Sequence, residues 1–313
     1  MPPRLHLRRM SLFVLTLCTV MGLAGCKPEP VPVAAVAASA PEAAVRKMVS
    51  HLHDNDLHGF ARDAVPAADY VRLESAWRAG SSRWPLTELP LDDQLEPLLA
   101  TLAAPNAEGT LQQGFKRNFA NQGKDLKDAA HSLGLFGVQY VKREGVFTEE
   151  ERAHYAQMIA ALSDWAGRAP LSDPRRSTAA IPPLVTAARK TGLTTPQSFH
   201  DAGMTGTLQR LSPFLAAVKT VLADYGLPLD RSLAELETAL VEETGDMARV
   251  RITYPLGQRR IDTVVSLRRR DGHWYLSDPL RRAELALATP AGENAAPETL
   301  QIPALPIPAR KPD

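Results

Sequence analysis

The spacing of apolar residues changes once along this chain, and the change restricts which folds the chain can adopt. Up to Asp230 apolar side chains recur every three or four residues, which is the spacing of one face of an α-helix. From Arg249 onward they alternate with polar residues, which is the spacing of a strand with one buried face. The sequence therefore predicts an α+β protein. A helical region over 42–230 should precede an antiparallel sheet region over 231–288.

Start and stop signals divide the helical region. Capping-box patterns predict helix starts at Ser39-x-x-Glu42 and at Thr148-x-x-Glu151. Asn55-Asp56 is expected to end the first helix and to cap the next, and Pro66 opens another. Further helices are indicated by apolar stripes at helical spacing: Val45, Met48, Val49 and Leu52; Tyr70, Leu73 and Trp77; Leu111 through Leu126 and Leu133 to Tyr140; Tyr155, Met158, Ile159, Leu162 and Trp165.

The later helices carry prolines. Asp173-Pro174 begins a segment that we expect Pro182-Pro183 to interrupt. The longest stripe runs from Leu208 to Tyr225, and Gly226 and Pro228 should end it. Pro213 lies inside this stripe and predicts a kink, or a fresh start at Ser212. The stripe is too short to indicate a coiled coil, so core packing is the better interpretation.

The sheet region reads as a four-stranded meander. Asp271-Gly272 is typical of a two-residue hairpin turn, which pairs Leu267 with Leu276 and Ser266 with Ser277. Leu256-Gly257 as the preceding loop pairs Ile252 with Ile261 and Arg251 with Asp262. A further strand over 238–243 would set Val241 against Val250. One face is then apolar, formed by Val250, Ile252, Tyr254, Ile261, Val265, Leu267, Trp274 and Leu276. We expect the helix over 208–225 to cover this face.

The end of the meander reads D-G-H-W-Y-L-S-D over 271–278. Helices followed by such a meander resemble the cone-shaped modules akin to nuclear transport factor 2, which several envelope lipoproteins share. The resemblance covers about a fifth of the chain. It implies a fold for this region and carries no functional residues over.

The N-terminal residues have the pattern of a signal peptide. A basic segment containing three arginines precedes an apolar stretch over 10–21, which is shorter than the roughly 20 residues that a membrane span requires. The next residues, Leu23-Ala24-Gly25-Cys26, resemble the lipobox of bacterial lipoproteins. That resemblance implies cleavage between Gly25 and Cys26 and diacylglycerol on the cysteine sulfur. The alternative is an ordinary secreted protein in which L-A-G-C occurs by chance.

Cleavage before Cys26 would alter the composition of the chain. The full sequence has 36 basic and 35 acidic residues, and loss of three arginines leaves 33 against 35, a net charge of −2. Such a chain is not expected to bind nucleic acid. Cys18 would leave with the signal, so no disulfide and no thiolate metal site can form. Pro- and Ala-rich residues over 26–41 are interpreted as a tether, and 289–313 as a Pro-rich tail or a ligand for a partner's aromatic groove.

One cluster has the residue types of a metal or catalytic site: His51, His53, Asp54, Asp56 and His58. Chelation from a helix requires histidines four residues apart, whereas His51 and His53 are two apart and point in nearly opposite directions. A solvated helix end is the simpler interpretation, with Asp54 and Asp56 as ending and capping residues. We expect no metal and no cofactor.

Other candidates have simple structural explanations. Glu149–Glu151 lies in a helix's first turn, where negative charge is favourable. Trp77 and Trp84 could stack on sugar rings or pack in the core. Arginines at the hairpin ends could meet anionic lipid or protect a sheet edge: Arg259, Arg260 and Arg268–Arg270. His200-Asp201 lacks a serine in a nucleophile-elbow context, and no phosphate-binding loop is present.

The sequence therefore favours a non-catalytic protein of the cell envelope, held to a membrane by lipid on Cys26. Because Lys27 follows the cysteine, we expect the outer membrane and a periplasmic orientation. A protein partner in the envelope is the first hypothesis, and the oligomeric state is left open. The second is a small-ligand or lipid binder with a cavity between the sheet and its helix. The third is a cell-wall hydrolase, which needs convergent carboxylates.

Overall fold

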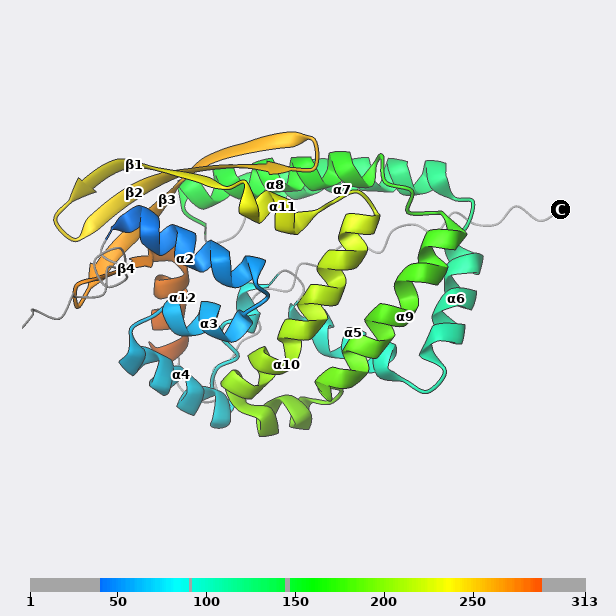
Figure 1. Ribbon diagram of the computed structural model, residues 1–313, viewed down its shortest axis with the longest axis horizontal. Helices are drawn as coiled ribbons and strands as arrows, with labels where there is room; N and C mark the ends of the chain where they lie inside the picture. The colour runs from blue at the N-terminus through cyan, green and yellow to red at the C-terminus, as the bar shows by residue number, and fades with distance from the viewer. Residues whose placement is uncertain (1–39, 90–91, 144–146, 289–313) are drawn as a thin grey trace, which may run out of the picture. The chain divides into compact units, whose positions relative to one another are not determined.

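The computed structural model describes residues 40–89, 92–143 and 147–288, and its α+β architecture confirms the predicted fold class. Figure 1 shows a helical part followed by one sheet. The predictions for the signal peptide, Cys26, the tether and the tail lie outside the described residues. The elements in chain order are α2 (Pro41–His53), α3 (Leu57–Asp63), α4 (Ala67–Arg78), η1 (Leu86–Glu88), α5 (Asp92–Ala103), α6 (Ala107–Asn118), α7 (Gly123–Arg143), α8 (Glu149–Ala166), α9 (Pro174–Thr191), α10 (Pro196–Asp224), α11 (Leu229–Ala234), β1 (Glu237–Thr244), β2 (Met247–Leu256), β3 (Arg259–Arg270), β4 (His273–Leu276) and α12 (Ser277–Ala288).

Several predicted boundaries are confirmed. The capping box at Thr148 and Glu151 is formed, with each side chain bonded to the other residue's backbone N–H. Asp56 caps α3 by accepting a hydrogen bond from the N–H of Gly59, and Asp173 caps α9. The first helix begins at Pro41, whereas Ser39 of the predicted capping box is outside the described residues.

The largest core lies among the helices. It is formed by buried residues of α3, α4, α5, α9, α10 and α12, including Leu73, Trp77, Leu99, Val185, Met204, Leu208 and Leu280. Its fully buried side chains supply most of the hydrophobic stabilisation of this part of the chain.

The prediction that Pro182-Pro183 interrupts α9 was wrong, and so was the alternative that α10 makes a fresh start at Ser212. Helix α9 runs through Pro182 and Pro183 without a break, because its buried residues Val185 and Ala188 hold it against neighbouring helices. Helix α10 contains Pro213 but breaks earlier, at Gly203, where φ is 68° and ψ is 178°. Glycine adopts that conformation without a steric cost, which explains the position of the break.

The sheet is an antiparallel meander of order β1-β2-β3-β4, as predicted, and Leu267 pairs with Leu276. The other registers differ. Ile252 pairs with Thr263 rather than Ile261, because the loop is Gly257-Gln258 and the pairing shifts by two residues. A shift of two preserves the face of every side chain, so the predicted apolar face is still the buried one. Arg251 contacts Asp262 diagonally, with Nε 2.7 Å from Oδ1.

Two predicted strand pairs at the ends of the sheet were also wrong. Val250 pairs with Leu240, and a bulge leaves Val241 as an extra, half-exposed residue. Ser277 begins α12 instead of pairing with Ser266, so the predicted sheet region ends in a helix. Residues 111–140 form two helices rather than one, and Asn121 between them has a φ of 66°.

The apolar face of the sheet is covered by α2 and α8 and not, as predicted, by the long late helix. Val45 of α2 joins Val250, Ile252, Leu267 and Trp274 in one buried cluster. Ala161 of α8 joins Leu227, Leu256 and Ile261 in another. Helix α10 contributes its buried residues to the helical core instead. Apolar residues at helical spacing predict that one face of a helix is buried, but they do not predict which element that face packs against.

Side chains of α8 also protect the sheet edge. Strand β4 is short, so the first half of β3 has no strand on one side. The Gln157 amide donates to the carbonyl of Asp262 at 2.9 Å and accepts from its N–H at 3.0 Å. This side chain satisfies backbone groups that would otherwise be open to pairing with another chain. In the described ranges no helix is long and apolar enough to cross a membrane.

Candidate functional site

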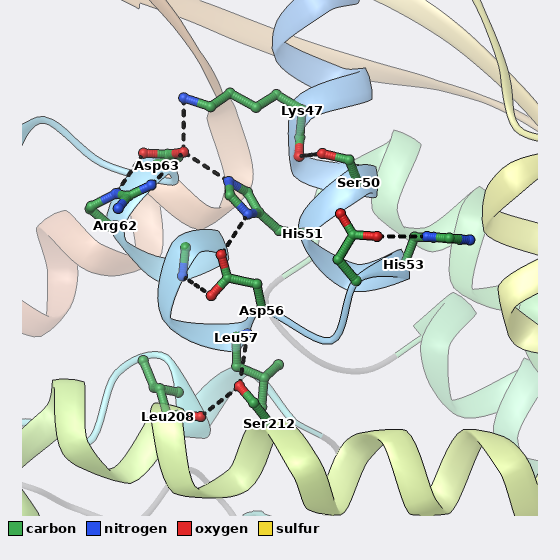
Figure 2. Close-up of polar contacts among 12 residues, drawn as sticks. Lys47, Ser50, His51, His53, Asp56, Leu57, Arg62, Asp63, Leu208 and Ser212 are labelled. Carbon is green, nitrogen blue, oxygen red and sulfur yellow. Dashed lines mark hydrogen bonds and ion pairs between the residues drawn. The ribbon is translucent and has the colours of Figure 1, made fainter.

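The predicted cluster is partly assembled around His51, on the last turn of α2 (Figure 2). The Nδ1 atom of His51 lies 3.1 Å from Oδ2 of Asp56, and Nε2 lies 2.8 Å from Oδ2 of Asp63. Asp63 is on α3, and the sequence analysis did not include it. Asp63 is the last residue of α3, and no local pattern in the sequence indicates that it contacts His51. The pair of aspartates joins α2 to α3.

Asp63 receives further charged donors. Lys47 Nζ lies 2.8 Å from Oδ2, and Arg62 Nε lies 3.1 Å from Oδ1. Burial would raise the pKa of Asp63, but the hydrogen bonds from Arg62, Lys47 and His51 outweigh it and hold the pKa far below its ordinary value. Asp63 is therefore a carboxylate at any physiological pH.

Gly59 allows the close approach of these groups. A Cβ atom at this position would lie 2.0 Å from Oδ2 of Asp56 and 2.6 Å from the His51 ring. The N–H of Gly59 also donates to Oδ1 of Asp56 at 2.8 Å, and this bond is the main reason that the pKa of Asp56 is lowered.

The remaining candidates lie apart from His51. His53 Nδ1 contacts only its neighbour Asp54, at 2.8 Å on an exposed surface. His58 packs its ring edge against Tyr70, with centroids 6.0 Å apart. Only His51 and Asp56 of the five predicted residues are brought together.

The chemistry open to this cluster is limited. Both ring nitrogens of His51 lie against carboxylate oxygens, so neither nitrogen is free to reach a substrate. Within the described ranges no group of three His, Cys, Asp or Glu side chains is arranged to hold a metal ion. The geometry fits a polar clasp that fixes α2 against α3 and so positions the helix that covers the sheet.

A second charged cluster brings together residues from three segments that are far apart in the sequence, and no local pattern indicates it. Arg282 of α12 forms ion pairs with Glu88 of η1 and with Glu151 of α8. Arg281 adds a contact to Glu151 at 3.2 Å. Burial raises the pKa of Glu88 although Arg282 opposes the shift. Since Glu151 also completes the capping box of α8, this cluster ties α8 and α12 together.

The other candidates have partners or are buried. Trp77 and Trp84 lie in the helical core and are not free to stack on a sugar. The arginines at the hairpin ends all form ion pairs with acidic side chains: Arg259 with Asp164, Arg260 with Glu237, Arg269 with Asp246, and both Arg268 and Arg270 with Glu284. His200 Nε2 lies 2.9 Å from the carbonyl oxygen of Arg78.

Helix α7 has an unusual distribution of side chains. Its small residues face inward, toward α8: a Cβ on Gly134 would lie 2.2 Å from Oγ of Ser163, and one on Gly137 would lie 3.1 Å from Ile159. Ser163 Oγ also donates to the carbonyl of Ala130 at 2.9 Å. Helices α7 and α8 run side by side in Figure 1.

Val141 of α7 is buried, but other large apolar residues of this helix are exposed. Leu133 is 42 % exposed and Phe136 is 45 % exposed. They belong to a line along the helix that we call the apolar stripe, formed by Leu126, Ala129, Leu133, Phe136 and Tyr140. The rings of Phe136 and Tyr140 lie 6.3 Å apart. Leu133 and Phe136 are exposed and the other three members are partly buried, so the stripe is a candidate interaction site.

Recesses open on the described surface, and the two described next do not lie under the sheet's apolar face. One, of about 650 Å³, is lined by the β2–β3 turn and the start of β1. The other, of about 500 Å³, is lined by Leu89 and the first turns of α5. Val250, Ile252 and Leu267 are buried against α2 and do not line either recess.

Comparisons of the chain with protein-family models, with curated proteins and with solved structures found no match.

Proposed function

We propose that this protein is a non-catalytic, lipid-anchored protein of the cell envelope that docks a protein partner on the apolar stripe of α7. The observation that carries the proposal is the inverted arrangement of this helix. Glycines lie against α8, and Leu133 and Phe136 face solvent. A helix that only filled space would bury its leucines and expose its small residues.

The packing of the sheet supports a protein partner over a small ligand. A ligand between the sheet and its covering helix requires a cavity of several hundred Å³ lined by the apolar face. That face is instead filled by Val45 of α2 and by Ala161 of α8. Close packing of this kind resembles an ordinary protein interior.

The charged clusters give less support to a hydrolase. A general acid and base must reach a substrate in a cleft. Asp54 and Asp56 are half-exposed or more, and His51 is occupied on both nitrogens. Glu88 and Glu151 are each occupied by Arg282. These ion pairs stabilise contacts between segments.

The anchor is the part of the proposal that comes from the sequence. Lipid on Cys26 would concentrate the folded body at one membrane face and would make a modest docking surface effective. Growth with a clickable fatty-acid analogue should label the wild-type protein, and Cys26→Ala should remove the label. A protein that stays unlabelled, and that Cys26→Ala leaves in the same cell fraction, would refute the anchor.

The docking surface is tested separately. A photoreactive amino acid at Leu133 should give one discrete crosslinked adduct in intact cells, and Phe136→Asp should abolish that adduct. The matched control is the same photoreactive residue at Leu135, which is 59 % exposed on the same helix but lies off the stripe. Equal adducts from positions 133 and 135, or none from 133, would argue against docking on α7.

A further inference from the structure

We infer that the partner of the apolar stripe is a second copy of this chain, bound antiparallel through α7. The inference rests on the docking surface proposed above and names its occupant. The stripe residues are spaced three, four, three and four apart, from Leu126 to Tyr140. That spacing keeps one seam of a helix turned toward a partner helix.

The stripe is complementary to itself when the second helix runs in the opposite direction. The stripe residues alternate between the a and d positions of a heptad. In an antiparallel seam an a residue of one helix packs beside a d residue of the partner helix. Leu133 then lies beside the partner's Phe136, and Ala129 lies beside the partner's Tyr140. Ala129, the smallest stripe residue, then faces the large ring of Tyr140, so the Ala129–Tyr140 pair fills a volume similar to that of the Leu133–Phe136 pair.

Charges at the ends of α7 select the antiparallel direction. Asp125 lies at the N-terminal end and Arg143 at the C-terminal end, and both flank the same side of the stripe by the 100° step of a helix. In the part of the chain that the structure describes, neither forms an ion pair. An antiparallel copy brings Asp125 beside the partner's Arg143 at both ends of the seam. A parallel copy would place like charges together, and it would also align the helix dipoles unfavourably.

The packing of α7 on α8 leaves this face accessible. Gly134 and Gly137 bring the two helices close together on an adjoining side of α7, roughly a quarter turn from the stripe by the 100° step of a helix, and Leu133 and Phe136 remain exposed. Two copies would form a four-helix arrangement, with α7 and its partner at the centre. The seam spans only about two heptads, which is short for pairing in free solution. Anchoring both copies to one membrane raises their effective concentration and favours the pair.

Disulfide trapping tests the pairing and its direction, because the described residues contain no cysteine and the unsubstituted full chain, oxidised in parallel, gives the background from Cys26. The full chain is expressed in cells, and membranes are oxidised without detergent. Ala129→Cys and Tyr140→Cys, co-expressed on differently tagged copies, should form a mixed dimer. Each variant alone should give less than about a tenth of that yield. In the antiparallel seam identical positions are offset by 11 residues, about 16 Å, which exceeds the roughly 7 Å that a disulfide tolerates.

Two further variants report on the stripe itself. Leu133→Asp added to both copies should reduce the mixed dimer at least tenfold, whereas Leu135→Asp should leave it unchanged. Dimers from each single cysteine variant would indicate parallel pairing and overturn the antiparallel seam. Absence of any dimer would overturn self-pairing. If a photoreactive residue at position 133 then captures a different protein, docking on α7 survives while the second copy does not. If the dimer forms on a chain that carries no fatty acid, self-pairing survives and the anchor does not.

Discussion

Glu74 on α4 accepts two hydrogen bonds from Thr205 on α10, one from the backbone N–H and one from the hydroxyl, both at 2.9 Å. Thr205 follows the break at Gly203, where the helix restarts. The first N–H groups of a helix have no partner within it, and a carboxylate there satisfies one of them. Glu74 therefore acts as an N-cap supplied by another helix.

Glu74→Ala should destabilise the protein by about 1–2 kcal/mol, because it leaves the Thr205 N–H without an acceptor. The free energy of unfolding from urea titration measures the change. Arg78→Ala is the control: it removes the exposed ion pair of Glu74 but not the cap, and should cost less than about 0.5 kcal/mol. Equal losses from both variants would show that the cap contributes nothing.

Gly59→Ala should destabilise the protein by about 2–3 kcal/mol, because the added methyl group collides with Asp56 and with the His51 ring. Gly114→Ala in α6 is the matched control. A Cβ there meets nothing within 4 Å, so the substitution should stabilise the helix by about 0.5–1 kcal/mol. Thermal unfolding followed by circular dichroism separates the two outcomes. A stabilising Gly59→Ala would contradict the close packing of the clasp.

Asp63 should contribute to acid sensitivity. Its pKa in the folded state is held below its ordinary value of 3.8, so its stabilisation is complete above that pH and is lost as the pH falls through the folded value. Wild-type protein should therefore lose more unfolding free energy between about pH 5 and about pH 3 than Asp63→Asn does. Asp54→Asn, at an exposed position, should follow the wild-type slope. Parallel slopes for wild type and Asp63→Asn would refute the role of the clasp.

His154 should affect stability nearer to neutral pH. Its Nε2 lies 2.7 Å from the hydroxyl of Tyr254 on β2, and burial lowers its pKa from 6.5. A depressed folded pKa gives stabilisation above pH 6.5 that is lost as the pH falls below it, since the unfolded chain takes up the proton first. His154→Gln keeps a hydrogen bond to Tyr254 and should flatten the decline between about pH 7 and about pH 5. His131→Gln, on the exposed side of α7, should leave the decline intact.

Lys219 is a buried cation that ends α2. Its Nζ donates to the carbonyls of Leu52 and His53, each at 2.9 Å, and pairs with Asp230. Lys219→Met keeps the length of the side chain but leaves these acceptors unsatisfied, so we expect a loss of about 2–3 kcal/mol in urea titration. Lys190→Met, at an exposed position in α9, should change stability by less than about 0.5 kcal/mol. If Lys219→Met leaves the free energy of unfolding unchanged, the three contacts of Lys219 do no more than compensate for the cost of burying its charge.

Local signals in the sequence predicted much of the fold. Capping residues such as Thr148 and Asp56 bond to backbone groups within one helical turn. Their partners are therefore close in the sequence and can be predicted from it. The alternation in β2 and β3 identified the buried face of the sheet correctly. It survived a register error of two residues because the side-chain period is also two.

Relations between distant segments could not be predicted in the same way. No pattern in the sequence around Val45 predicts that it packs on Val250. No pattern around Glu74 predicts that it caps the helix that restarts before Thr205. The partners of the candidate cluster have the same long-range character: His51 contacts Asp63 of the next helix, whereas His53, two residues further along the sequence, contacts Asp54. Helix α12 was missed because its residues follow a strand directly, with no turn residues between Leu276 and Ser277.

The contact of α2 with the sheet sets an order on folding. Arg46 Nη1 lies 2.6 Å from the Thr238 hydroxyl, 192 residues away in sequence, and Val45 is buried only once β2 and β3 exist. During synthesis, α2, the first helix in the described part of the chain, therefore stays without its partner until most of the chain has been made. Contacts this remote slow folding and prolong the exposure of apolar surface. A chain that ended before Met247 would leave Val45 without its partners, because Val250, Ile252, Leu267 and Trp274 all lie beyond that point.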